Sequence, residues 1–407
     1  MYLNGRIALL AALLIVIVIG TGCGYQYHCT DLSGNGPSCY SNGSSSGSGG
    51  SGSGGTGGSG GGVGGGPQAD YFYYLGTGGY TMQAAGLSSA GAFSAMANYT
   101  APSLPTGGAA DALIADEQYL YIAYTASTGG GEILAYTIDK SSGALAAITG
   151  QPFSTGTPKC DAIASDPSNR FLYCSDSSTG NVAAFTIASS TGALTTVAAS
   201  PFTIFGAIPN NMAVDSSGTY LYVAPGIYAF NIDQNTGALS PVAGSPFFTL
   251  SSGRLQAIPG SAYMVGMGNT VAVAGGDAHL YLMPIEPGTG ALLSETPFPT
   301  VNAPYQLAVH PSGGFVYTFA LVTGGIAPVE GYAFNSSTGA LSAMSSSPFT
   351  SLPTLLAGKI DQNGTELFAP SGGGQYVVVT IDPTSGALTQ SSTPLNVPSS
   401  TVFAVTN

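Results

Sequence analysis

A Gly-Ala-Leu tripeptide placed in a turn constrains the fold of this 407-residue chain more than any other sequence feature. It recurs every 45–53 residues, and the first copy is the degenerate Gly-Ala-Phe. The glycines of the seven copies are Gly91, Gly143, Gly192, Gly237, Gly290, Gly339 and Gly386. This spacing is typical of propeller blades, not of helical repeats or leucine-rich solenoids. We therefore expect seven copies of one structural unit.

Residues 209–247 show what the unit is. Apolar runs at 212–214, 220–223, 227–232 and 238–242 are separated by Gly, Asp, Asn and Ser. Short β-branched and aromatic runs between such turn residues predict an antiparallel meander of four strands. A proline and an apolar residue follow each unit. Because proline lacks the amide donor that a central strand needs, we expect this pair to leave the blade at the crossover.

The first and last segments of the repeat region match neighbouring strands of one unit. Residues 401–407 match the first strand of the unit, whereas 70–74 match its second strand. The last strand is therefore expected to complete the blade that the N-terminus begins, which leaves no unpaired edge. The sequence predicts an all-β fold over residues 68–407, a seven-bladed β-propeller of four-stranded antiparallel blades. A ring of repeats lets one domain reach this size.

The first 67 residues predict export. Arg6 precedes 13 apolar residues, too few to span a bilayer as a helix, and small residues then lead to Cys23. A cysteine after small residues resembles the bacterial lipobox, so we expect residues 1–22 to be a lipoprotein signal peptide and Cys23 to be acylated. Plain secretion is the alternative. Residues 23–67 are expected to be a flexible tether, since 23 of the 26 residues in 41–66 are Gly or Ser.

The charge of the chain limits its partners. Charged residues make up 6% of the sequence, and loss of Arg6 with the signal leaves 5 basic against 19 acidic residues, a net charge of −14. Such a surface repels phosphate backbones and acidic lipid headgroups. We expect no nucleic-acid partner, membrane contact only through the lipid anchor, and a monomer facing the periplasm or the cell surface.

Five cysteines leave two possible pairs once Cys23 carries a lipid. Cys160 and Cys174 stand symmetrically about Pro167 in a turn, so they are predicted to face each other across a hairpin. Cys29 and Cys39 are the second candidate pair. The His and Cys residues lack metal-ligand spacing, and we expect neither a metal nor a cofactor.

The repeat resembles the seven-bladed lactonase family, which includes phosphogluconolactonase-like and muconate-cycloisomerase-like propellers, over nearly all of residues 68–407. The resemblance implies a carboxylic ester hydrolase of the lactonase type. In the family pattern, the first strand of the third blade reads Pro-His-x-His. The next blade reads Pro-Arg-His, with a Glu after its second strand.

This chain departs from that pattern at every reactive position. Lys159 and Asp161 replace the two histidines, Asn210 and Asn211 replace Arg and His, and Gly226 replaces Glu. Asparagine does not exchange a proton near neutral pH and does not replace a bidentate guanidinium. We therefore assign no catalytic residue by the family route.

The positions of the basic residues predict a binding site. Lys159 and Arg254 fall at the start of the first strand of their units, a position expected to line one mouth of the central channel. Polar residues at the same position complete the candidate set, namely Asp161, Asn210, Asn211, Tyr305 and Gln306. In so acidic a chain, such cations favour an anionic or sugar-like ligand. The alternative is that they only neutralise nearby carboxylates such as Asp161 and Asp361.

Three functions fit these observations. The first is a binding or scaffold module at the cell envelope, whose partner is an envelope protein or a glycan. The second is a divergent lactone hydrolase or cycloisomerase, and the third is a structural protein of the cell surface. The replaced family residues favour a protein that is not an enzyme; if it is one, the resemblance implies a carboxylic ester hydrolase of the lactonase type. The fifth copy also carries an extra apolar segment, 270–274, to which we assign no role.

Overall fold

The computed structural model describes residues 70–75, 81–87, 93–94, 96, 99–204, 209–248, 254–268, 277–322, 325–371, 375–390, 394–396 and 402–406. The predictions for the signal peptide, the tether, Cys23, the pairing of Cys29 with Cys39, and the segment 270–274 lie outside these residues. Within the described part of the chain, no helix is long and apolar enough to cross a membrane.

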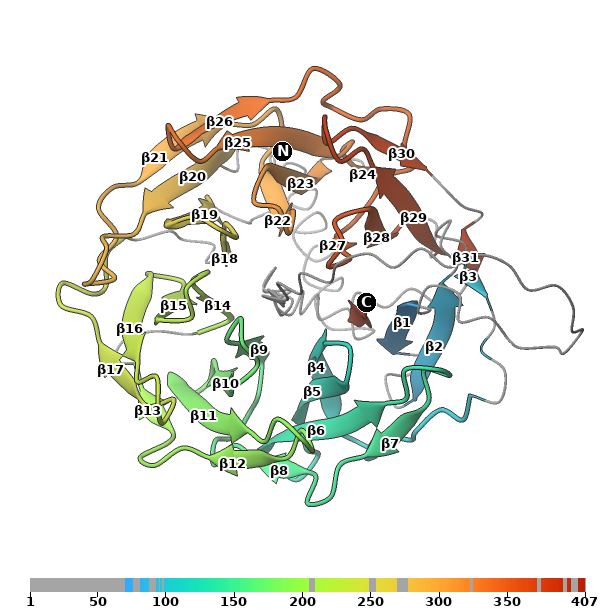
Figure 1. Cartoon of the computed structure of the whole chain (residues 1–407), viewed down its shortest axis with the longest axis vertical. Helices are drawn as coiled ribbons and strands as arrows, with labels where there is room; N and C mark the ends of the chain where they lie inside the picture. Colours follow the sequence, from blue (N-terminus) through green and yellow to red (C-terminus); the bar gives the residue numbers. More distant parts are fainter. Residues whose placement is uncertain are drawn as a thin grey trace, which may run out of the picture.

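The described residues form seven antiparallel sheets arranged around one axis (Figure 1). Each sheet is a blade with four main strands, as the sequence predicts, and four blades carry a short fifth strand. In chain order the strands are, for blade I, β1 (Asp70–Leu75), β2 (Met82–Leu87), β3 (Phe93–Ser94) and β32 (Phe403–Val405); for blade II, β4 (Ala109–Ala115), β5 (Tyr119–Thr125), β6 (Gly131–Ile138), β7 (Leu145–Ala147) and β8 (Phe153–Ser154); for blade III, β9 (Ala162–Ser165), β10 (Phe171–Asp176), β11 (Asn181–Ile187), β12 (Leu194–Thr196) and β13 (Phe202–Thr203); for blade IV, β14 (Asn211–Val214), β15 (Tyr220–Ala224), β16 (Tyr228–Ile232) and β17 (Leu239–Pro241); for blade V, β18 (Leu255–Ala257), β19 (Tyr263–Met267), β20 (His279–Pro284) and β21 (Thr296–Pro299); for blade VI, β22 (Pro304–Val309), β23 (Phe315–Val322), β24 (Gly325–Ile326), β25 (Glu330–Asn335) and β26 (Ala340–Ala343); and for blade VII, β27 (Lys359–Ile360), β28 (Glu366–Pro370), β29 (Gln375–Ile381), β30 (Leu388–Gln390) and β31 (Leu395–Asn396).

The C-terminal strand closes the ring, as predicted. β32 pairs with β1, with Tyr73 opposite Ala404, and the two strands lie side by side near the C-terminus in Figure 1. Lys359 of blade VII adds a second link, because its Nζ donates to the Leu113 carbonyl of blade II at 3.0 Å. The same ammonium lies 5.9 Å from the centre of the Phe403 ring, so it spans the closing strand. Closure therefore ties three blades together.

The recurring turn glycine is held by a tyrosine of the preceding blade. Gly290 has a φ of +74°, and a Cβ added there would lie 2.3 Å from the Tyr220 ring. Five tyrosine hydroxyls donate to turn-glycine carbonyls at 2.7–3.1 Å, in the pairs Tyr73–Gly143, Tyr121–Gly192, Tyr173–Gly237, Tyr222–Gly290 and Tyr317–Gly386. Burial raises the pKa of these tyrosines well above its usual value. The turn glycine thus recurs because it contacts a tyrosine of the preceding blade.

The hydrophobic core is divided among the blade interfaces. Each of seven clusters of buried apolar side chains draws on two adjacent blades. Between blades III and IV, for example, Tyr173 and Val182 pack with Met212 and Leu221. Because a blade buries its faces only against its neighbours, opening the ring would expose core at the broken interface.

The prediction that the proline and the following apolar residue leave the blade is wrong in blades II, III, V and VII. There the apolar residue lies in β8, β13, β21 or β31, each of which pairs within its own sheet. In blade III, β12 and β13 both pair with β11, so the outer strand breaks around Pro201 and then continues. The Ser200–Pro201 peptide bond is cis, and the Ser200 hydroxyl accepts the Ala184 N–H at 2.9 Å. A serine side chain thus bonds the strand where proline interrupts the ladder. An outer-edge position tolerates proline because half of its backbone groups face away from the sheet.

Candidate ligand site at the ring axis

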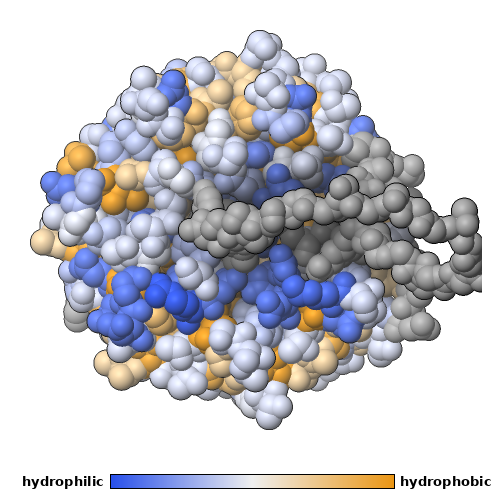
Figure 2. All heavy atoms as spheres, viewed as in Figure 1, coloured by the Kyte–Doolittle hydropathy of each residue, from blue (hydrophilic) through white to orange (hydrophobic). Residues whose placement is uncertain are grey.

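The innermost strands of the seven blades surround the ring axis (Figure 1). On the face shown in Figure 2, hydrophilic residues gather next to the centre. Each blade can be aligned on the residue that opens the turn after its innermost strand, such as Asp116, Asp166, Asp215 or His310. Polar side chains stand five residues before it in blades II, III, IV and VI. We call these residues the axial row: Asp111, Asp161, Asn210 and Tyr305.

Two positions of the axial row are irregular in the same way. The pairing of β4 with β5 skips Asp111 between Ala110 and Ala112, and the pairing of β22 with β23 skips Tyr305. A β-bulge breaks the alternation of a strand and re-aims one side chain, and bulges are frequent beside functional sites. The same bulge occurs in two blades at the same position of the repeat. We therefore take the axial row as a candidate for functional side chains.

The first group of contacts at the axis joins blades V and VI. Arg254 Nη1 donates to Gln306 Oε1 at 3.3 Å, and the guanidinium carbon lies 5.5 Å from the centre of the Tyr305 ring. Gln306 is 3% exposed, and its buried Nε2 has no hydrogen-bond acceptor among the described residues. The structure thus brings together three of the residues predicted from the sequence.

The two asparagines of blade IV differ in their surroundings. Asn211 is buried, and its Oδ1 accepts the Leu255 N–H at 2.9 Å, which links innermost strands β14 and β18. Asn210 is exposed. Asn211 therefore has at least a structural contact, whereas Asn210 presents its side chain to solvent.

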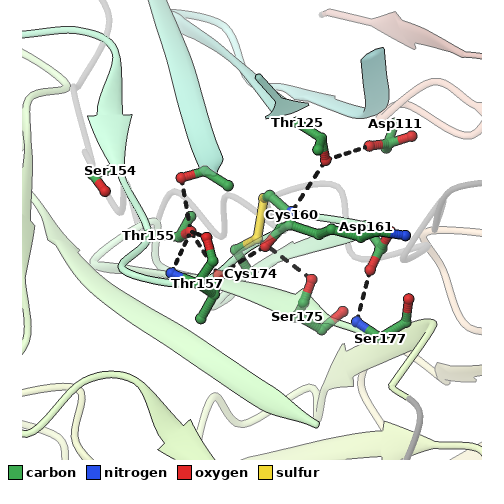
Figure 3. The surroundings of a disulfide bond; sticks show 12 residues. Asp111, Thr125, Ser154, Thr155, Thr157, Cys160, Asp161, Cys174, Ser175 and Ser177 are labelled. Atoms are coloured by element: carbon green, nitrogen blue, oxygen red, sulfur yellow. Dashed lines mark hydrogen bonds between the residues drawn. A yellow bond between two sulfur atoms is a disulfide. The ribbon is translucent and has the colours of Figure 1, made fainter. Parts of the chain in front are cut away.

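The second group lies on blades II and III (Figure 3). Asp111 is 6% exposed and accepts a hydrogen bond from the Thr125 hydroxyl at 3.1 Å, and Asp161 is 5% exposed and accepts the Ser177 N–H at 2.7 Å. Burial raises the pKa of Asp111 to about 7; the Asp161 charge adds to this rise, and Thr125 and Lys159 oppose it. Asp111 therefore gains and loses a proton near neutral pH.

A disulfide holds the segment that carries Lys159 and Asp161. The predicted bond between Cys160 and Cys174 is present, with Cα atoms 5.6 Å apart. The predicted pairing about Pro167 is wrong in register, because Cys174 stands opposite Ile163 in the ladder. Cys160 reaches its partner from the residues before β9. In Figure 3, Asp111 and Asp161 lie on the same side of this bond.

Sequence analysis missed Asp111, although a signal for it existed. Asp111 and Asp161 each stand five residues before a turn aspartate, Asp116 and Asp166, in consecutive copies. Alignment on the turn aspartates would have paired them, whereas alignment on Gly-Ala-Leu and on the family pattern did not. No three His, Cys, Asp or Glu side chains among the described residues are grouped as metal ligands.

The comparisons with known proteins agree with this architecture. The profile of the family "Lactonase, 7-bladed beta-propeller" matches residues 67–204 and 155–247. No curated protein matches the chain. Among solved structures, a putative 6-phosphogluconolactonase from Bacteroides fragilis is 16% identical with a TM-score of 0.63, and the match covers 84% of this chain and 98% of that one.

Two further structures are similar. A putative 6-phosphogluconolactonase from Bacteroides uniformis is 15% identical, with a TM-score of 0.64 and coverage of 83% of this chain and 99% of that one. The periplasmic gluconolactonase of Pseudomonas aeruginosa is also 15% identical, with a TM-score of 0.56 and coverage of 83% and 98%. Identities this low carry the fold and not the activity. The chain is a lactonase-like seven-bladed β-propeller.

Proposed function

We propose that the protein is an exported, lipid-anchored propeller that binds a polyhydroxylated anion, a sugar acid or an acidic glycan of the cell envelope, at the ring axis. The observation that carries this proposal is the amide of Gln306. Its Oε1 is engaged by Arg254, while its buried Nε2 lacks an acceptor among the described residues. A buried donor left unpaired costs about 1–3 kcal/mol, which an acceptor oxygen of a ligand would recover.

The positive charge of Arg254 favours a negatively charged ligand. A guanidinium in a chain of net charge −13 is a distinctive feature, and its planar fork matches a carboxylate or a phosphate. The Tyr305 ring beside it restricts where the guanidinium lies. Together the three side chains present a cation and an amide donor to one ligand.

The binding proposal is tested by isothermal titration calorimetry of the purified propeller, residues 68–407, with D-gluconate and a panel of acidic and neutral sugars. Arg254→Ala should weaken binding of the acidic sugar about 10–100-fold, the effect of losing a charged hydrogen bond. Gln306→Leu should weaken it less. The matched control is Lys140→Ala, which removes an exposed cation that pairs with Glu117.

Two outcomes would overturn the binding proposal. Either no acidic sugar binds, or Arg254→Ala and Lys140→Ala bind equally well. A propeller that binds no ligand saturably would favour a structural role at the cell surface. Capture of an envelope protein that Arg254→Ala leaves unchanged would favour a scaffold that uses another surface.

Anchoring at Cys23 has its own test. Palmitate labelling of cells that express the full chain should mark the wild type and not Cys23→Ala, which should also leave the membrane fraction. Labelling of Cys23→Ala at the wild-type level would contradict the anchor.

A second function, hydrolysis of a lactone, is favoured by one observation, the carboxyl group of Asp111 that titrates near neutral pH. The family histidines are replaced here, so this chemistry would need a different acid and base.

A further inference from the structure

We propose that a second ligand site lies between blades IV and V, on the face of the ring opposite the axial row, and that it binds a neutral saccharide. A cavity of about 580 Å³ is open to solvent there, within the range of roughly 300–1,000 Å³ that small-molecule sites occupy. Asn210 of the axial row precedes β14, whereas Asp215, which lines the cavity, follows the end of that strand. The inference does not depend on the ligand proposed for the ring axis.

The cavity is built from turns of two neighbouring blades (Figure 1). It is lined by the turn between β14 and β15 of blade IV, and by the turns between β18 and β19 and after β20 of blade V. Ser216 Oγ donates to the Ser261 carbonyl oxygen at 2.6 Å, which ties the turns of the two blades together. Gly288 has a φ of +82°, and a Cβ added there would meet no atom within 4 Å. The turns therefore hold a preformed space between them.

One hydroxyl of the lining lacks the partner that its counterparts have. Tyr71, Tyr119 and Tyr220 occupy the same position of the repeat, each with its ring against the turn glycine of the next blade. The hydroxyls of Tyr71 and Tyr119 donate, at 3.3 and 3.1 Å, to a carbonyl oxygen three residues before that glycine. Pro287 stands at this place in blade V, yet among the described residues none bonds the Tyr220 hydroxyl. This hydroxyl is therefore available to a ligand in the cavity.

The Tyr220 side chain is held in place by its ring. The residue is 6% exposed, and the ring packs against Gly290. Burial, and then the charge of Asp215, raise the pKa of the Tyr220 hydroxyl, so this group stays protonated and can both donate and accept a hydrogen bond. Because the side chain is already fixed, it loses little conformational entropy when a ligand binds.

The lining offers no charge to a ligand. Asp215 is 5% exposed, and its carboxylate accepts the N–H groups of Ser217, Thr219 and Tyr220 at 3.0, 2.8 and 2.7 Å. The other lining side chains are hydroxyls, such as Thr219, or apolar groups, such as Ala262 and Pro287. Hydroxyls that donate and accept, beside apolar carbon, match a sugar ring, whose own hydroxyls do the same and whose C–H groups are apolar.

The same features count against a peptide. An extended peptide binds by adding a strand to a free sheet edge, or by placing apolar or charged side chains in pockets. The cavity is lined by turns, and its carboxylate, Asp215, is occupied by backbone donors of its own turn. A small polyhydroxylated ring is therefore the ligand that the lining favours.

The test titrates the full chain with three neutral oligosaccharides, maltotriose, cellotriose and chitotriose, by isothermal titration calorimetry. At least one of them should bind saturably. Tyr220→Phe should weaken this binding about 2–10-fold, the effect of losing one neutral hydrogen bond. Ala262→Phe should abolish it, because this substitution places a ring in the cavity from an exposed position.

Two matched controls make the same substitutions elsewhere. Tyr119→Phe removes the equivalent hydroxyl of blade II, which already donates to the Ser189 carbonyl oxygen, and Ala146→Phe adds a ring at an exposed position of β7. Both variants should bind the neutral sugar as the wild type does. Arg254→Ala should also keep this affinity while it weakens binding of D-gluconate, which separates the cavity from the site at the ring axis.

The inference is overturned if none of the three sugars binds saturably, or if Tyr220→Phe and Tyr119→Phe bind with the same affinity. Loss of neutral-sugar binding in Arg254→Ala would assign the sugar to the ring axis and would overturn it too. Binding of the neutral peptide Gly-Ser-Ala-Thr-Gly in place of the sugars would assign the cavity to peptides. Absence of neutral-sugar binding leaves the axial ligand, which D-gluconate tests, unaffected.

Discussion

Replacement of Asp111 by asparagine should make the protein more stable at alkaline pH. The pKa of this carboxyl is raised from 3.8 to about 7, first by burial and then by the Asp161 charge. The unfolded chain loses the proton near pH 4, while the folded chain keeps it until about pH 7. Between these values the unfolded state binds fewer protons, so the free energy of unfolding falls as the pH rises. A shift of about three pH units corresponds to about 4 kcal/mol as an upper limit.

Asparagine has nearly the shape of the carboxyl group and keeps an acceptor for the Thr125 hydroxyl. Asp111→Asn should therefore equal the wild type near pH 4 and exceed it by up to about 4 kcal/mol at pH 8. Urea unfolding followed by tyrosine fluorescence suits a chain with 23 Tyr and no Trp. Parallel stability curves of the two proteins from pH 4 to pH 8 would refute the reasoning.

Three further predictions concern the fold. Tyr222→Phe should destabilise the protein by about 1–3 kcal/mol in urea unfolding, because it leaves the buried Gly290 carbonyl without its donor; a loss below about 0.5 kcal/mol would contradict the interblade role. Removal of residues 401–407 should open the ring and expose the core between blades I and VII, and an unchanged thermal midpoint would argue against closure by β32. Burial lowers the pKa of His310, whose Nε2 lies 2.7 Å from the Gly364 carbonyl oxygen. Because the unfolded chain then binds a proton more readily, the free energy of unfolding should fall as the pH drops through about 6.5. His310→Asn should lack this fall, and an equal fall in both proteins would contradict the role of His310.

The ring could be predicted from the sequence because each blade repeats the same local signals. A turn glycine with positive φ, such as Gly290, appears as a fixed motif, and the offset between the first and last strands shows directly in the alignment of the copies. The tyrosine that bonds the turn glycine is also repeated, in five of the blades that the structure describes. It went unassigned because its partner lies in the next blade, 64–71 residues along the chain.

The site was predicted less completely, for a physical reason. Arg254, Tyr305 and Gln306 were found because they fall at the start of the first strand of their units in the sequence, and the structure places Arg254 in contact with the other two. The repeat position that Asp111 shares with Asp161 can be read from the sequence, but the burial and the bulge that distinguish Asp111 leave no local mark there. The outer-strand proline was misjudged because the Ser200 hydroxyl accepts the Ala184 N–H and so keeps the strand bonded where proline interrupts the ladder.

The most direct test of the account is a crystal structure of the full chain with bound D-gluconate. The account predicts the carboxylate on the Arg254 guanidinium, with an oxygen of the ligand accepting from Gln306 Nε2. A ligand bound away from blades V and VI would contradict the proposed site, and so would a Gln306 Nε2 that donates to a protein atom in the unliganded crystal.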